Sequence, residues 1–220
     1  MIILPGDQGT EQWRANRRGM PTASQFHRLL SPARLELSSQ SFSYLCELVA
    51  ERVLGVDVGP EATAFMERGQ LMEQEAVAWY EFVRETETTK VGLCVRNDGL
   101  VGCSPDRLVG DAGALELKCP SAPVHVGYVL EGLGQKYRLQ AQGQLWITGR
   151  KWVDVLSYNP DLPPALVRLY PEPDVFKALD EVMPAFLQRL DEATVQLGGK
   201  SRGHDIESLL RQSIVEAEAK

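Results

Sequence analysis

Residues 104–120 read SPDRLVGDAGALELKCP, and this stretch predicts the centre of the fold. Leu108-Val109 and residues 114–118 flank a segment with two glycines, a pattern that predicts two strands joined by a turn. Successive side chains of a strand alternate between its faces, so Glu116 and Lys118 share one face and the leucines beside them occupy the other. A carboxylate and an ammonium group therefore point into the same space.

A second carboxylate opens the first of these two strands. Asp106 precedes the strand, and the short hairpin can bring it close to Glu116. Two like charges at that range need a cation if both are to stay ionised. A small number of hard oxygen ligands favours Mg²⁺ or Mn²⁺, and such a site with a lysine beside it suits the hydrolysis of phosphodiester bonds. Taken alone, D-x₉-E-x-K also fits an ordinary exposed hairpin.

Several motifs lie along the chain in a fixed order, within this stretch and on both sides of it. They are WRANRRG at 13–19 with TAS at 22–24, GQLME at 69–73, SPD at 104–106 with ELKCP at 116–120, and QAQ at 140–142 with LW at 145–146. Together they resemble the lambda exonuclease family of viral alkaline exonucleases and YqaJ-type recombinases, which belongs to the PD-(D/E)xK nuclease superfamily. The resemblance extends over about residues 11 to 190. Several ordered motifs are harder to meet by chance than one.

The resemblance implies a role for each residue of the central motif. It implies that Asp106 bridges two divalent ions, and that Glu116 binds one of them together with the main-chain carbonyl of Leu117. Two ions so placed stabilise both the attacking and the leaving oxygen of a phosphodiester. Lys118 is expected to orient or polarise the attacking water. The implied cofactor is Mg²⁺, two ions per active site, for which Mn²⁺ can substitute.

Two helical motifs are expected to complete this site. Glu73 matches the glutamate of the G-x₃-E motif and is expected to join the acidic site directly or through a metal-bound water. Gln140 is expected to hydrogen-bond near the metal or the nucleophilic water. Gln142 lies two residues further along the helix and therefore on a different face. Without the resemblance, these residues would be an exposed helical glutamate and solvated glutamines.

Arg17 and Ser24 match the residues that hold a 5′-phosphate in this family. The chemistry is suitable because a guanidinium binds two phosphate oxygens at once, and a serine near a helix N-terminus adds a donor where anions are favoured. Arg18 is the neighbour of Arg17, and the choice between them rests on the alignment of Trp13 and Gly19. A surface arginine and a capping serine are the alternative interpretation.

Length and composition predict one soluble domain. A chain of 220 residues with 44% hydrophobic content can bury one substantial core. We expect a single nuclease domain over 1–197, followed by a linker and an amphipathic C-terminal helix over 198–220. The absence of a signal peptide and of a long apolar run predicts a cytoplasmic protein without membrane contact. The four cysteines contain no C-x₂-C pair, which disfavours zinc and iron–sulfur sites.

Charge is unevenly distributed along the chain. The net charge of −7 argues against a protein that coats DNA with its whole surface. Residues 11–34 nevertheless contain five arginines and one glutamate, whereas residues 35–87 contain eleven acidic side chains and three arginines. A basic segment on an acidic body could direct DNA toward one cleft. A solvated helix face is the alternative.

Periodicity predicts the secondary structure around the motifs. Helices are expected at 42–54, 63–84, 135–147 and 174–197, a hairpin at 91–103 with its turn at Asn97-Asp98-Gly99, and strands at 152–158 and 166–170. We expect the last helix to be interrupted near Pro184. The four tryptophans are expected in the core. The predicted fold is α/β, a mixed central β-sheet flanked by helices, with a PD-(D/E)xK restriction-endonuclease-like core.

The resemblance implies a Mg²⁺-dependent 5′-to-3′ exonuclease. It would digest one strand of linear double-stranded DNA with 5′-phosphorylated ends, leaving 3′ overhangs for recombination by strand annealing. It further implies a homotrimer, a single-strand annealing protein as partner, and a phage or prophage origin in a bacterial cytoplasm. Two alternatives stay open. One is another PD-(D/E)xK nuclease, RecB-like or a restriction-type endonuclease, and the other is a non-catalytic DNA-end binding adaptor.

Overall fold

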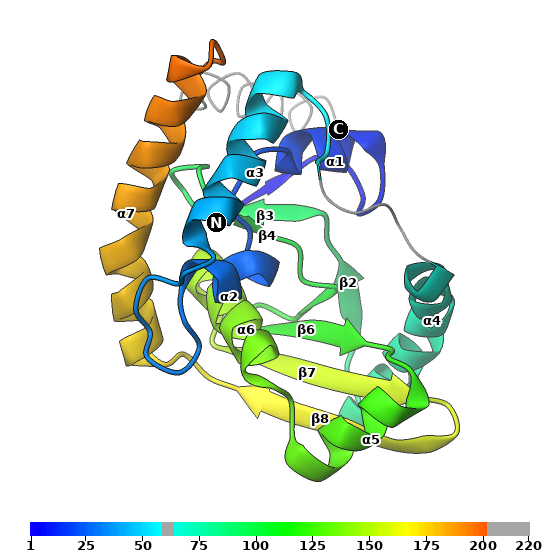
Figure 1. The fold of residues 1–220 in the computed structure, drawn as a ribbon. Helices are drawn as coiled ribbons and strands as arrows, with labels where there is room; N and C mark the ends of the chain where they lie inside the picture. Colours follow the sequence, from blue (N-terminus) through cyan, green and yellow to red (C-terminus); the bar gives the residue numbers. More distant parts are fainter. Residues whose placement is uncertain (59–63, 202–220) are drawn as a thin grey trace.

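A five-stranded mixed sheet lies at the centre of the computed structural model, which describes residues 1–58 and 64–201, with backbone alone for 64–71 (Figure 1). Its order is β2 (Thr88–Lys90), β5 (Arg107–Val109), β6 (Gly113–Lys118), β7 (Trp152–Asn159) and β8 (Leu162–Leu169). β6 and β7 run parallel and the other neighbours are antiparallel. A parallel pair needs a crossover, which is supplied by α5 (Ala122–Glu131) and α6 (Gln135–Thr148).

A second, smaller sheet supports the entrance to the central hairpin. It consists of β1 (Ile2–Leu4), β3 (Leu93–Val95) and β4 (Gly102–Cys103). β3 and β4 form the hairpin that the Asn-Asp-Gly turn predicts, and this prediction is confirmed. The chain leaves β4 directly into Ser104 and the central motif.

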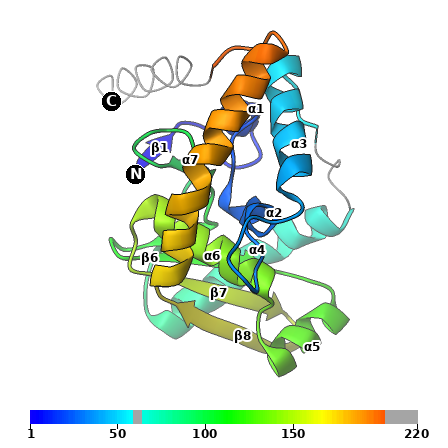
Figure 2. The same ribbon diagram turned by 60° about the vertical axis from the view of Figure 1, so that its left-hand side comes forward.

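Helices cover both faces of the central sheet and extend beyond it. They are α1 (Glu11–Arg17), the short 3-10 helix η1 (Ala23–Gln25), α2 (Phe26–Leu29), α3 (Ser41–Leu54), α4 (Ala64–Arg84) and α7 (Pro173–Gln196), in addition to α5 and α6. Figure 2 shows α3 and α7 packed side by side. The helices predicted near 42–54, 63–84 and 135–147 are therefore confirmed. The C-terminal helix predicted within 198–220 falls mainly outside the described residues.

Different helices cover the two faces of the sheet. Leu115 and Leu117 of β6 pack with Ala76 and Tyr80 of α4 in one apolar cluster. Ala114, on the opposite face, packs in another cluster with residues of α6. The alternation predicted for β6 is thus observed, and the side chain of Glu116 lies on the α6 face.

Three expectations about secondary structure and burial need correction. α7 continues through Pro184, so the predicted interruption is wrong. Its buried positions, including Met183 and Phe186 on either side of the proline, pack into the core, and this packing outweighs one missing backbone hydrogen bond. β8 begins at Leu162, earlier than predicted, since an edge strand tolerates prolines. The tryptophans are only partly buried at the rims of the apolar clusters.

A buried carboxylate joins α4 to the sheet. Asp154 of β7 is fully buried and accepts hydrogen bonds from the Tyr80 hydroxyl at 2.8 Å and from two nitrogens of Arg168 at 2.7 Å each. Arg84 lies 3.6 Å from the same carboxylate. The positive charges and the hydroxyl together compensate for the loss of water around Asp154.

We expect Arg168→Leu to lower the free energy of unfolding by about 3 kcal/mol, because it leaves a buried carboxylate without its bidentate partner. Tyr80→Phe removes a single hydrogen bond and should cost only about 1 kcal/mol. Urea denaturation of both variants measures the difference. A loss below about 1 kcal/mol for Arg168→Leu would show that this ion pair does not stabilise the sheet.

Candidate active site

The residues of the central motif meet at one end of β5 and β6. Asp106 precedes β5, and its Oδ2 accepts a hydrogen bond from the main-chain N–H of Leu117 at 2.5 Å. Lys118 Nζ donates to Glu116 Oε1 at 2.5 Å. The hairpin therefore brings together the two carboxylates and the lysine, as the spacing predicted. Lys118 also lies over the ring of Tyr137, with Nζ 4.9 Å from the centroid.

Two glutamines of α6 hold the carboxylate of Glu116. Gln140 Nε2 donates to Oε1 and Gln144 Nε2 to Oε2, each at 2.5 Å. The motif matches do not include Gln144, although it follows Gln140 by four residues and so shares its helix face. Its own Oε1 is buried and has no hydrogen-bond partner among the described residues. Gln142 faces away, as expected, and binds the main chain at Tyr170 and Glu172.

The charges at this end of the sheet influence one another strongly. Burial and then the negative charge of Glu116 raise the pKa of Asp106 well above its usual range. For Lys118, burial lowers the pKa, but the charges of Glu116 and Asp106 outweigh this effect and raise it above the ordinary value. Lys118 is therefore protonated at neutral pH, and its one positive charge interacts with both Glu116 and Asp106.

Glu73 reaches the same region from α4, on the other side of the sheet. Its side chain is half-buried, and burial raises its pKa, while the charges of Arg107 and Lys90 lower it. Glu116 adds a smaller upward shift to the pKa of Glu73. Glu73 is therefore near enough to Glu116 for their charges to interact across the sheet. The side chains of residues 69–71, which belong to the same sequence motif, fall outside the described part.

The donor chemistry fits a hard divalent cation, although the site is not arranged around one here. Among the described residues, no three acidic, histidine or cysteine side chains are grouped closely enough to hold a metal ion. The oxygens of Glu116 accept hydrogen bonds from Lys118 and from the amides of Gln140 and Gln144. A cation would take the place of some of these donors and relieve the repulsion between Glu116 and Asp106.

A second group of polar side chains lies beside the acidic site. Arg17 Nη2 donates to Thr22 Oγ1 at 3.2 Å and to Ser24 Oγ at 3.4 Å, and the guanidinium lies 5.3 Å from the centroid of the Trp13 ring. Trp13 Nε1 in turn donates to Ser104 Oγ at 2.9 Å. The structure therefore brings Arg17 and Ser24 together and connects them to the segment that precedes Asp106.

Gly19 explains why Arg17 rather than Arg18 meets Ser24. Gly19 adopts a φ of +64°, and a Cβ there would lie 2.3 Å from Cγ of Arg52. Its N–H donates to Glu51 and its carbonyl accepts from Arg52, so α3 holds the turn after α1 in place. Arg18 points to the other side, where it pairs with Asp57 at 2.9 Å.

Of the histidines in the described part of the chain, His27 lies in α2 and His125 in α5. His125 is fully buried, with Nδ1 2.7 Å from Ser157 Oγ and Nε2 3.0 Å from the Pro163 carbonyl oxygen. It fastens α5 to the sheet. The sequence patterns did not predict α5, a helix that begins after Ser121 and has a proline in its first turn. All four cysteines are free, and Cys46 is exposed.

Similarity to known proteins identifies the family to which the chain belongs. Residues 12–151 match the family described as YqaJ-like viral recombinase domain. The chain belongs to this family, which confirms the predicted membership and the predicted mixed α/β fold. No curated protein matches the chain. In the described residues, no helix has the length and apolar character needed to cross a membrane.

Crystal structures of exonucleases are similar to this chain. An alkaline exonuclease (LHK-Exo) from Laribacter hongkongensis is 31% identical, with a TM-score of 0.77 over 86% of this chain and 96% of that one. Its complex with dAMP gives a TM-score of 0.76 at the same identity and coverage. A phage-related exonuclease from Haemophilus somnus 129PT, 14% identical, has a TM-score of 0.67 over 81% of this chain and 96% of that one, and shows the fold alone.

Close packing between α6 and η1 positions Ser24 next to the acidic site, and Gly143 permits it. A Cβ at Gly143 would lie 2.6 Å from Cδ2 of Phe26 and 2.9 Å from Cβ of Ala23.

We expect Gly143→Ala to lower the free energy of unfolding by about 1–3 kcal/mol through overpacking. Gly127→Ala is the matched control, because a Cβ at that helical position meets nothing within 4 Å. It should be neutral or stabilising by up to about 1 kcal/mol. Thermal or urea unfolding of the two variants compares them, and equal stabilities would contradict the proposed contact.

Proposed function

We propose that this protein is a metal-dependent exonuclease that degrades one strand of linear double-stranded DNA from its 5′ end. The product would be a duplex with 3′ single-stranded overhangs, ready for recombination by strand annealing. The observation that carries the proposal is the position of Arg17 and Ser24 beside the cluster of Asp106, Glu116 and Lys118. A phosphate-binding pair next to a hydrolytic cluster suits an enzyme that works from an end. The family match and the names of the similar exonucleases support it.

The acidic cluster would hold two Mg²⁺ ions, for which Mn²⁺ can substitute. Asp106, Glu116 and the main-chain carbonyl of Leu117 are the proposed ligands, and Glu73 would join them directly or through a water. When bound, the ions supply positive charge to the attacking and leaving oxygens. With this assignment the chain would be a PD-(D/E)xK enzyme. The bound cations would offset the repulsion between Asp106 and Glu116.

Lys118 and Gln140 act on the water and on the scissile phosphate in this proposal. The ammonium group of Lys118 lies between Glu116 and the ring of Tyr137. These two contacts fix its position before the substrate binds. It would orient the attacking water and balance charge that develops on the phosphate oxygens. Gln140, once released from Glu116, would offer its amide to the same water.

Arg17 and Ser24 bind the terminal 5′-phosphate in this proposal. The guanidinium already lies within hydrogen-bonding distance of the Ser24 and Thr22 hydroxyls, so a phosphate could accept from the arginine and from hydroxyl groups together. Trp13 packs against the guanidinium and limits its rotation.

We further propose a homotrimer around the DNA, with a single-strand annealing protein as its partner in a bacterial cytoplasm, encoded by a phage or prophage. The net charge of −7 makes a purely electrostatic grip on DNA weak. A closed ring would keep an acidic protein on its substrate by topology. A solution mass equal to one chain at working concentration would contradict the ring.

Nucleotide release from linear duplex DNA tests the central proposal. With Mg²⁺ and 5′-phosphorylated ends, the wild type should release nucleotides, and a closed circular duplex should stay intact. Lys118→Ala should lower the rate at least about a hundredfold, because it removes a charge directed at the reacting phosphate, while Mg²⁺ binding by calorimetry is retained.

Other outcomes of this assay identify the alternatives. Cleavage of the closed circle would favour a restriction-type or RecB-like nuclease of the same superfamily. End binding without hydrolysis under Mg²⁺ or Mn²⁺ would favour a non-catalytic adaptor.

A pair of neighbouring arginines tests the recognition of the end. Arg17→Ala should lower kcat/KM for 5′-phosphorylated ends by about tenfold or more relative to 5′-hydroxyl ends, because a charge-assisted hydrogen bond is lost. Arg18→Ala is the control, since this side chain pairs with Asp57 away from Ser24. Equal losses for both kinds of end in Arg17→Ala would remove the proposed phosphate contact.

A further inference from the structure

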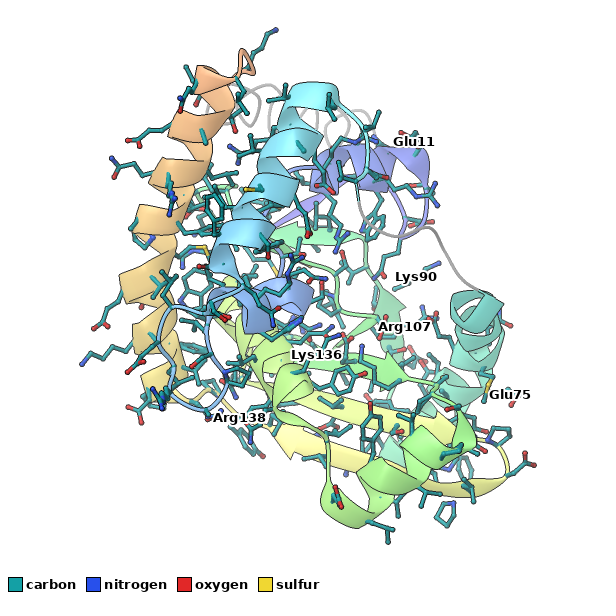
Figure 3. The ribbon with its side chains drawn as sticks, viewed as in Figure 1. Glu11, Glu75, Lys90, Arg107, Lys136 and Arg138 are labelled. Atoms are coloured by element: carbon teal, nitrogen blue, oxygen red, sulfur yellow. The ribbon has the colours of Figure 1, made fainter. Side chains whose placement is uncertain are left out.

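Two basic side chains lie directly opposite each other on the edge of the central sheet. Lys90 of β2 and Arg107 of β5 are partners in the antiparallel register, so both side chains project from the same face of the sheet. Figure 3 shows them close together between β2 and α4. Like charges in this arrangement destabilise a strand pair. The arrangement therefore calls for a negatively charged partner.

The described part of the protein supplies too little negative charge for this pair. Lys90 is exposed and Arg107 half-buried. Neither makes a side-chain hydrogen bond or an ion pair with any described residue, whereas Arg168 of the same sheet is paired with a carboxylate. Glu73 is near enough for both positive charges to lower its pKa. One partly buried carboxylate faces two cations, and the open side of the pair is turned to solvent.

A role in preventing aggregation accounts for only one of the two residues. β2 is an edge strand of the sheet, and lysines on edge strands discourage pairing with other chains. Arg107 lies one strand further in and is already covered by β6 on its other side. Its charge is not needed to protect an edge. Its position immediately after Asp106 instead connects the pair to the acidic site.

The pair also lies on the opposite side of the acidic site from the Arg17–Ser24 group. Arg107 is the register partner of Leu115 and thus shares the α4 face, whereas Glu116 and Lys118 lie on the α6 face. Ser24 belongs to η1, which packs on α6. The two basic groups therefore lie on different sides of the carboxylates, so one DNA backbone that contacts both groups would pass the acidic site.

We propose that Lys90 and Arg107 form a second phosphate-binding site, which holds the DNA backbone beyond the scissile bond, on the side that has not yet been digested. The inference rests on the proposed function, because it takes DNA as the substrate of the acidic site. An arginine can bind two oxygens of one phosphate, and an exposed lysine on its flexible stem can reach the same or the next phosphate. Such contacts hold the backbone without reading its sequence.

The salt dependence of DNA binding tests this site. The probe is a blunt-ended duplex with either 5′-phosphate or 5′-hydroxyl ends, titrated in EDTA so that no cleavage occurs. Lys90→Gln and Arg107→Gln should each reduce the slope of log K against log salt by about 1. Each should weaken binding at about 0.1 M salt by about three- to tenfold, equally for both end chemistries. Arg17→Ala should instead remove the preference for phosphate.

A matched control and a second background make the outcome decisive. Lys177→Gln removes an exposed lysine of α7, which pairs with Glu181 on the same helix, and it should leave affinity and slope unchanged. If Lys90 and Arg107 serve only to neutralise Glu73, their substitution will have no effect in a Glu73→Gln background. If the two substitutions still weaken DNA binding in that background, the second phosphate site is supported. If they no longer weaken binding there, the site is overturned.

The remaining outcomes are distinguishable from failure of the proposed function. Wild-type affinity and salt slope in both variants would overturn the second phosphate site, even if the wild type degrades linear DNA. Absence of hydrolysis by the wild type, with reduced slopes in the variants, would overturn the exonuclease and leave the site standing. Lys90→Gln keeps the test valid if Arg107→Gln fails to fold, because Lys90 is exposed on an edge strand.

Discussion

The constraint on which the candidate site depends is the placement of two carboxylates close together by one hairpin. Asp106 and Glu116 belong to the same short β5–β6 unit, and burial together with the charge of Glu116 raises the pKa of Asp106. Lys118 and two glutamine amides compensate for Glu116, and the Leu117 N–H compensates for Asp106. A buried acidic pair is costly to maintain. Its presence is understandable if a cation and a phosphate complete the proposed site.

The two-faced sheet explains how distant segments converge on this pair. Because side chains of β6 alternate, its leucines anchor α4 on one face, and its charged residues meet α6 on the other. α6 brings Gln140 and Gln144 to Glu116, whereas α4 carries Glu73, whose pKa responds to the charge of Glu116. The segment around Ser24 reaches the site because Gly143 lets η1 approach α6 closely. The proposed functional groups thus come from both sides of one strand.

Much of the fold could be predicted from local pattern. The hairpin at Asn97-Asp98-Gly99, the β5–β6 hairpin and most helices follow from turn residues and periodicity. Local pattern failed at Pro184, where the core contacts of α7 outweigh the proline. It also missed α5, whose buried His125 finds its partners only on β7 and β8. In both cases the deciding contacts join residues far apart in the sequence.

The sequence by itself determined the residue types of the site, their order, the face on which Glu116 and Lys118 lie, and the family. Spacing within one hairpin is enough to place Glu116 and Lys118 on one face, because backbone geometry is periodic. The family follows from the resemblance of several ordered motifs. Only the tertiary structure decided that Gln144 joins Gln140 at Glu116 and that Lys90 opposes Arg107. These pairings depend on which strands and helices become neighbours, and that follows from packing of the whole core rather than from any local repeat.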